Sequence, residues 1–362
     1  MPVNSARNHL VLLGAGRAHL QVLKGQARQS SNTRTTLVAP TPYYIEPAML
    51  PGYVAGRYAL EDIRVPLDAL VEASGAAFVP AHVVALDPAS RRVHLSSGDA
   101  LPYDVLSIDT EPVIEREAIE AALPGARRNA LFTHPLEAFV QLWPQMLALA
   151  QERALQVAVI ASDLPGVELA LAAADALAAP HGSRVTLIAG DAPLLPGHPP
   201  ALQKRLLDRL HTLGVTVLHE HCSGFDGQSV LLASGASLLC DAPVLAGGAG
   251  QPAWLLQSGL QVTETGALQI NERLQSDSHR QVFVVPRGAP PEVGPALDAN
   301  LRTALGGGSF RKAPLAAPRL QVLASGRDHA VAVWGPLSLQ GREVWHWKDR
   351  RDRRQLAELF AL

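Results

Sequence analysis

Cysteine, net charge and long apolar runs are all scarce in this 362-residue chain, and each scarcity excludes a class of protein. The two cysteines, Cys222 and Cys240, cannot build a disulfide framework, and no short-spaced cysteine pair is available for dithiol–disulfide chemistry. A net charge of −2 provides no electrostatic footprint for nucleic acid. No stretch approaches the roughly 18 uncharged apolar residues of a membrane-spanning helix, and residues 1–8 do not resemble a signal peptide. We therefore expect a cytoplasmic protein that binds no nucleic acid.

Apolar residues make up 48% of the chain, which is enough for a large core. They are arranged in a strand–helix–strand pattern that occurs twice. The apolar run from His9 to Leu13 ends in Gly14-Ala15-Gly16, a helical pattern follows from Arg17, and a second strand covers Thr35 to Ala39. The pattern begins again with a strand from Gln156 to Ala161. Two such units predict an α/β fold with parallel sheets and two Rossmann-like dinucleotide-binding modules.

The first glycine turn has the order of elements that a dinucleotide site needs. Gly14 permits a tight turn, and Gly16 allows a pyrophosphate to approach a helix N-terminus, where free N–H groups favour anions. His19 stands at the third glycine position, and Ala39-Pro40 replaces the usual acidic residue after the second strand. The turn alone favours dinucleotide binding over a plain strand–helix turn, without excluding the latter.

Several collinear segments carry a family resemblance. They resemble the flavoprotein branch found alone or fused to selenide, water dikinase, within the FAD/NAD(P)-dependent pyridine nucleotide-disulfide oxidoreductase superfamily and related to type II NADH dehydrogenases. The segments are Leu37–Pro40, Met49–Gly56, Leu101–Asp109, Val244–Ala249 followed by Pro252–Leu255, and Trp345–Arg354.

The resemblance implies a domain organisation and an activity. An FAD-binding domain would comprise residues 1–113 and 245–310, a crossover and inserted NAD(P)-binding-like domain residues 114–244, and a small C-terminal subdomain residues 311–362. Family members pass hydride from NAD(P)H to flavin and electrons onward, so FAD and NAD(P)H are the implied cofactors. The electron acceptor is not identified by the sequence.

Nine residues are predicted to contact the cofactor. Val83 is expected to meet the adenine through its backbone, and Arg287 could pair with a phosphate, although a surface arginine is the better explanation for it. The predicted set is Gly14, Gly16, Arg17, Ala18, His19, Pro40, Val83, Arg287 and Gly288. We name no catalytic residue and no metal ligand.

The sequence departs from the family pattern near the predicted flavin. Glu46-Pro47-Ala48 replaces Tyr-Ser-Gly, and Thr110-Glu111-Pro112 replaces a small Gly-Ser turn. Pro286-Arg287 replaces the Gly-Asp whose carboxylate holds the ribityl chain in the family. These changes favour a rival hypothesis, in which the chain is a catalytically degenerate nucleotide-binding or accessory protein of the same fold.

The second glycine turn is also altered. Of its three glycines only Gly166 remains, and Ala161 and Asp163 take the other two positions. A carboxylate at Asp163 brings a like charge into the space that a pyrophosphate needs. A turn kept only for folding is at least as good an interpretation as a working NAD(P)H site, and a nucleotide sensor that keeps the first site alone is a third possibility.

Two further clusters have competing explanations. His219 to Cys222 contains metal-ligand residue types, but zinc needs about four converging ligands, so the end of a surface strand is favoured. The arginine-rich segment from Lys348 to Arg354 could contact a membrane surface peripherally. Asp349 and Asp352 interrupt its positive charge, which favours a docked C-terminal element instead.

Overall fold

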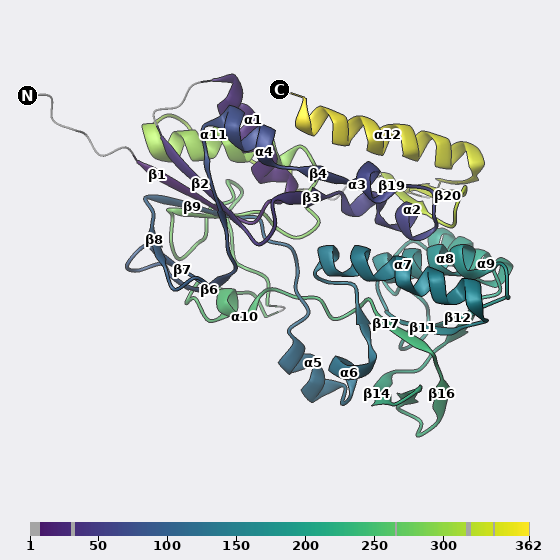
Figure 1. The fold of residues 1–362 in the computed structure, drawn as a ribbon. Helices are drawn as coiled ribbons and strands as arrows, with labels where there is room; N and C mark the ends of the chain where they lie inside the picture. The colour runs from purple at the N-terminus through teal and green to yellow at the C-terminus, as the bar shows by residue number, and fades with distance from the viewer. Residues whose placement is uncertain (1–7, 30–32, 265, 316–319, 336, 362) are drawn as a thin grey trace, which may run out of the picture.

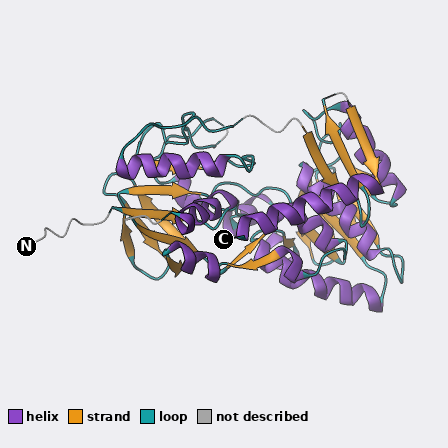
Figure 2. Ribbon diagram, turned by 90° about the horizontal axis from the view of Figure 1, so that it is seen from above, coloured by secondary structure: helices purple, strands orange, loops and turns teal. Residues whose placement is uncertain are grey.

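The computed structural model describes residues 8–29, 33–264, 266–315, 320–335 and 337–361. Two five-stranded parallel sheets organise this part of the chain, which confirms the predicted α/β class (Figure 1). Seen from above in Figure 2, their strands form separate groups at the two ends of the molecule. None of the described helices is long and apolar enough to cross a membrane.

The first sheet holds the predicted FAD-binding unit. Its strand order is β18-β9-β1-β2-β5, all parallel, so residues far apart in sequence meet beside the central strand β1. Every residue of β1 is buried, as expected for an apolar strand covered on both faces. The strands are β1 His9–Leu13, β2 Arg34–Ala39, β5 Ala77–Pro80, β9 Val105–Ile108 and β18 Val282–Val284.

Helices and small sheets surround the first sheet. Helix α1 packs against α11, and Gly25 allows the close approach, because a Cβ there would lie 2.6 Å from Asp298 Oδ2. Helices in this region are α1 Arg17–Arg28, α2 Leu50–Val54, α3 Leu60–Ile63, α4 Asp68–Ser74, α10 Ala253–Leu256 and α11 Val293–Gly306, with the 3₁₀ turn η1 Pro47–Met49. The added strands are β3 Tyr43–Ile45, β4 Arg64–Pro66, β6 Val83–Asp87, β7 Arg92–Leu95 and β8 Ala100–Pro102.

The second sheet contains the second strand–helix–strand unit. Its order is β10-β17-β11-β12-β13, again parallel. Its strands are β10 Leu131–Phe132, β11 Gln156–Ile160, β12 Arg184–Ile188, β13 Thr216–Leu218 and β17 Ala242–Leu245, and β14 Cys222–Asp226, β15 Ser229–Leu232 and β16 Ser237–Leu239 form a separate antiparallel sheet. The helices are α5 Arg116–Ala122, α6 Ala126–Asn129, α7 Leu136–Glu152, α8 Leu164–Leu177 and α9 Pro200–Thr212.

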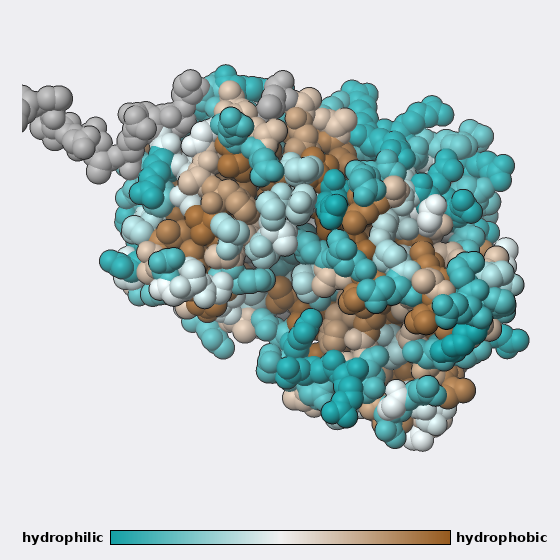
Figure 3. Space-filling view, in the orientation of Figure 1, coloured by the Kyte–Doolittle hydropathy of each residue, from teal (hydrophilic) through white to brown (hydrophobic). Residues whose placement is uncertain are grey.

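The C-terminal region docks onto the rest of the chain. An antiparallel sheet of β19 Leu320–Ala324, β20 Ala330–Trp334 and β21 Leu337–Gly341 precedes α12 Arg342–Phe360. Trp345 of α12 is fully buried and stacks on Tyr58, with ring centroids 6.0 Å apart. The Lys348 ammonium pairs with Asp352 at 2.5 Å and donates to the Ala48 carbonyl at 2.7 Å. Hydrophilic residues cover α12 on the face shown in Figure 3. Its buried residues are Trp345, Lys348, Asp352, Leu356 and Leu359.

Candidate functional site

Two cavities lie on either side of the β1–α1 turn. The larger, about 870 Å³, is lined by the start of α1, by residues after β9 and by residues 284–291 after β18. The smaller, about 350 Å³, is lined by residues that follow β2 and by the start of β6. These segments belong to the first sheet or follow its strands, so the sheet topology gathers them at the carboxyl ends of parallel strands, where ligands of such sheets bind. Residues 249–251, and Pro135 with Glu137, complete the larger and the smaller lining from segments that follow strands of the second sheet.

Eight of the nine predicted cofactor residues line one or the other of these cavities. Gly14, Pro40 and Val83 line the smaller cavity. Gly16, Arg17, Ala18, Arg287 and Gly288 line the larger one. His19 lines neither and is completely buried. Their roles toward a cofactor stay predictions.

Both glycines of the first turn are required by close approach of Asp109. Gly14 has φ +90°, and a Cβ on it would lie 2.2 Å from the Asp109 carbonyl oxygen. A Cβ on Gly16 would lie 2.2 Å from Asp109 Cγ. The space over Gly16, where the sequence predicted a pyrophosphate, therefore contains the Asp109 carboxylate.

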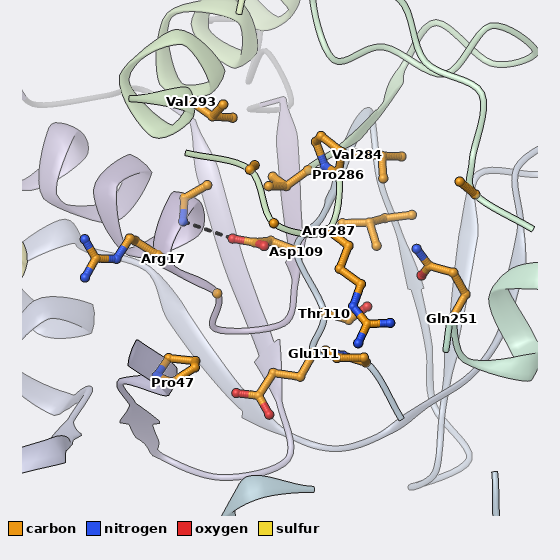
Figure 4. Close-up of a pocket in the computed structure, with 18 of the residues that line it drawn as sticks. Arg17, Pro47, Asp109, Thr110, Glu111, Gln251, Val284, Pro286, Arg287 and Val293 are labelled. Carbon is orange, nitrogen blue, oxygen red and sulfur yellow. Dashed lines mark hydrogen bonds between the residues drawn. The ribbon is translucent and has the colours of Figure 1, made fainter. Parts of the chain in front are cut away.

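Asp109 caps α1 from another strand. Its Oδ2 accepts hydrogen bonds from the backbone N–H groups of Ala18 at 3.0 Å and His19 at 3.3 Å (Figure 4). Free amides and the helix dipole make the first turn of a helix an anion site, and here a carboxylate of the same chain satisfies it. Sequence reasoning missed this role. The available signal was an acidic residue directly after a buried strand, Val105 to Ile108.

His19 explains how the turn dispenses with its third glycine. One ring nitrogen, Nδ1, lies 2.7 Å from the Gly14 carbonyl oxygen, and Nε2 lies 2.8 Å from Ser107 Oγ on β9. Burial lowers the pKa of His19, so the ring is neutral and can serve as donor at one nitrogen and acceptor at the other. The imidazole ties the glycine turn to the neighbouring strand.

Arg17 is held away from Asp109 by a different carboxylate. Its guanidinium lies 2.5 Å from Glu46 Oε2, and the Tyr44 hydroxyl donates to the same oxygen at 3.1 Å. In Figure 4 the Arg17 side chain points away from Asp109. Glu46 is the residue that departs from the family pattern in this segment, and it neutralises a cation that would otherwise face the larger cavity.

A second carboxylate, Glu111, faces both cavities. Glu111 lines each of them, whereas Glu137 lines the smaller one. The Thr41 hydroxyl donates a hydrogen bond to Glu137 Oε1 at 3.2 Å. Burial, reinforced by the negative charges of Glu137 and Asp109, raises the pKa of Glu111 to about 8. Arg287 contributes a positive charge to the larger cavity, and its guanidinium donates to the Ala249 carbonyl at 2.6 Å.

In the turn between β11 and α8, a side chain of the turn itself accepts a hydrogen bond from a first-turn amide of α8. Asp163 is the N-cap of α8, and its Oδ1 accepts from the Gly166 amide at 3.1 Å. Pro165 in the first turn has no N–H to offer a ligand. Gly166 is retained for close packing, because a Cβ on it would lie 2.0 Å from the Ala161 Cβ.

Comparison with known proteins decides the family. Residues 8–286 match the family described as pyridine nucleotide-disulphide oxidoreductase. The chain belongs to this family. Its members and the structural relatives below are FAD- and NAD(P)H-binding oxidoreductases. The resemblance expected from the sequence is confirmed.

A sequence relative and three solved structures place the chain further. Sulfide-quinone reductase of Aquifex aeolicus is 28% identical over 104 residues, which span 29% of this chain but only 24% of that protein. The structure of the sulfide:quinone oxidoreductase from the same organism has a TM-score of 0.74 at 17% identity, covering 97% of this chain and 91% of the other. The structure of NDH2 of Plasmodium falciparum in complex with NADH has a TM-score of 0.73 at 13% sequence identity, and the match covers 98% of each chain. The structure of water-forming NADH oxidase of Lactobacillus brevis has a TM-score of 0.68 at 17% sequence identity, and the match covers 90% of this chain and 74% of the other. At these identities the structures show the fold alone.

The two dinucleotide positions of this pyridine nucleotide-disulphide oxidoreductase differ in how well they suit a cofactor. At the first, the two cavities adjoin Gly14 and Gly16, and the Asp109 carboxylate lies over Gly16, where the sequence predicts a diphosphate. At the second, Asp163 accepts from the Gly166 amide and Pro165 has no N–H, so the α8 N-terminus has two fewer free donors for a diphosphate.

Proposed function

We propose that the chain is an FAD-dependent oxidoreductase that passes electrons from NAD(P)H through the flavin to an acceptor still to be identified. One observation carries the proposal, namely the pair of cavities on either side of the Gly14–Gly16 turn. Their volumes fall within the range of small-molecule sites, and a ligand with two bulky ends joined by a diphosphate would extend from one to the other.

The chain's own residues would divide the work of binding. Pro40 and Val83 would contact the adenosine in the smaller cavity, and the amides of Ala18 and His19 would hold the diphosphate. Backbone around Arg287 would border the ring in the larger cavity. When bound, FAD supplies the hydride chemistry, and the protein orients it and keeps water away.

A second candidate is the catalytically degenerate or accessory protein. The specific observation in its favour is that carboxylates of the chain itself, Asp109 and Asp163, occupy the N-termini of both dinucleotide helices. The α8 end is the stronger argument of the two, since Pro165 removes a donor there permanently. Under this hypothesis the fold is kept for binding a partner.

We extend the proposal to organisation and location. The division into residues 1–113 plus 245–310, 114–244 and 311–362 is supported by strand β18 joining the first sheet beside β9. The free thiols of Cys222 and Cys240 are compatible with a reducing compartment such as the cytoplasm. The docking of α12 through buried Trp345 favours a structural role for the tail over membrane contact.

Reconstitution with FAD tests the proposed function. We expect the purified protein to bind added FAD with flavin absorbance near 450 nm, and NADH or NADPH to bleach it under anaerobic conditions. Gly16→Val serves as the control, because its larger side chain fills the diphosphate approach, and it should lose FAD binding while keeping the wild-type circular dichroism spectrum. A wild-type protein that holds FAD but is not reduced by either nicotinamide would leave the accessory hypothesis standing.

A further inference from the structure

The position of Asp109 has a consequence for how the first site is loaded. We propose that Asp109 is a built-in competitor of the cofactor, whose carboxylate occupies the diphosphate position and must turn away before FAD can bind. The inference rests on the proposed function in that it takes FAD as the ligand. It adds a self-inhibiting contact within the same site.

The geometry leaves only the side chain free to move. The Asp109 backbone is fixed on both sides, because its N–H donates to the Leu13 carbonyl at 2.9 Å and its own carbonyl packs against Gly14. The carboxylate lies over Gly16 and accepts from the first-turn amides of α1 at 3.0 and 3.3 Å. Rotation about its side-chain torsions would release these amides without disturbing β9.

The charges around the carboxylate strengthen the competition. Glu111 and Glu137 add two acidic groups to the cavities, and the nearest helix cation, Arg17, is already paired with Glu46. A diphosphate brought to the α1 N-terminus would add negative charge beside the Asp109 carboxylate. An uncharged ligand such as adenosine would meet no such penalty, because it does not need the α1 amides.

A phosphate group on the ligand should therefore decide whether Asp109 weakens its binding. Wild-type protein should bind adenosine as well as a variant without Asp109 does. ADP and FAD should bind more weakly to wild type than to that variant, because only they must displace the carboxylate. The comparison separates obstruction at the diphosphate position from a general defect in the cavities.

The chain provides a matched control in Asp163. This residue caps α8 in the same way, through a hydrogen bond of 3.1 Å to the Gly166 amide, but it belongs to the other sheet. Asp163→Ala removes an equivalent carboxylate from a helix N-terminus outside the two cavities. Any effect of acidic-residue loss on net charge or on general helix stability should appear equally in this variant.

The experiment is calorimetric titration of adenosine, ADP and FAD into wild type, Asp109→Ala, Asp109→Asn and Asp163→Ala. We expect Asp109→Ala to bind ADP and FAD at least tenfold more tightly than wild type and adenosine equally. Asp109→Asn should gain less, because an asparagine still caps the helix and still fills the space over Gly16. Asp163→Ala should match wild type for all three ligands.

The outcomes also separate this inference from the proposed function. Equal FAD affinity in wild type and Asp109→Ala would overturn the inference and leave the oxidoreductase proposal intact. A tenfold gain in a flavoprotein that no nicotinamide reduces would support the inference and count against the oxidoreductase. Failure of both proteins to bind ADP and FAD would overturn both. Should Asp109→Ala fold poorly by circular dichroism, Asp109→Ser provides a short polar cap in its place, with the same expected direction.

Discussion

Replacing Glu111 by glutamine should change how the stability of the protein depends on pH. The pKa of Glu111 is raised from its usual 4.5 to about 8 by burial and by the neighbouring carboxylates Glu137 and Asp109. Between these two pH values the folded chain holds a proton that the unfolded chain has released. The free energy of unfolding therefore falls as pH rises from about 4.5 through 8, and the Glu111→Gln variant should lack this part of the decline.

The size of the effect follows from the pKa. A rise from 4.5 to about 8, at about 1.4 kcal/mol per pH unit, sets an upper limit of about 5 kcal/mol. Because the side chain is only partly covered and its neighbours can relax, we expect Glu111→Gln to be about 2 kcal/mol more stable than wild type at pH 9 and equal to it near pH 4.

Urea unfolding at pH 4, 6, 7.5 and 9, followed by circular dichroism, measures this difference. Glu72→Gln is the matched control, since Glu72 is exposed on α4 and should leave the pH dependence unchanged. Glu137→Gln should shift the pH dependence of the unfolding free energy part of the way toward that of Glu111→Gln. If Glu111→Gln and wild type differ by the same amount at every pH, the raised pKa of Glu111 is refuted.

Three further substitutions test how the turn and the C-terminal helix are held, each by denaturant unfolding against wild type. Lys348→Met should cost about 2–3 kcal/mol, because it removes the Lys348 ion pair from the buried Asp352 carboxylate, and adding Asp352→Leu should recover part of the loss. An unchanged denaturant midpoint in Lys348→Met would show that the Lys348–Asp352 ion pair does not stabilise the protein. His19→Leu should cost about 2 kcal/mol by stranding the Gly14 carbonyl and the Ser107 hydroxyl, and a neutral result would contradict the assigned hydrogen bonds. Trp345→Ala should cost about 3–5 kcal/mol, whereas a loss below 1 kcal/mol would mean that α12 is only loosely docked.

The parts of the fold that sequence could predict are those with local patterns. The apolar run of β1, the glycine turn and the helix after it follow from neighbouring residues alone. The same holds for β11, α8 and the Asp163 substitution, which the structure explains as an N-cap. The family resemblance implied that residues 245–310 belong with residues 1–113, but the pairing of Val282–Val284 with β9 is seen only in the structure.

The parts that could not be predicted depend on contacts between distant segments. Asp109 reaches the α1 amides only because β9 lies beside β1, and the Arg17–Glu46 pair joins α1 to the segment after β3. The altered residues near the predicted flavin were visible in the sequence. Their effect was not, since it arises from which charge each side chain meets in the folded protein.

We propose that the first-turn amides of α1 hold the diphosphate, and that the Asp109 carboxylate occupies them when no ligand is bound. Two-dimensional NMR of ¹⁵N-labelled, deuterated protein during a titration with ADP tests this most directly. We expect the amide resonances of Ala18 and His19 to shift on ADP addition, at lower ADP concentration in Asp109→Ala than in wild type. ADP binding that leaves both resonances unmoved in the two proteins would contradict it.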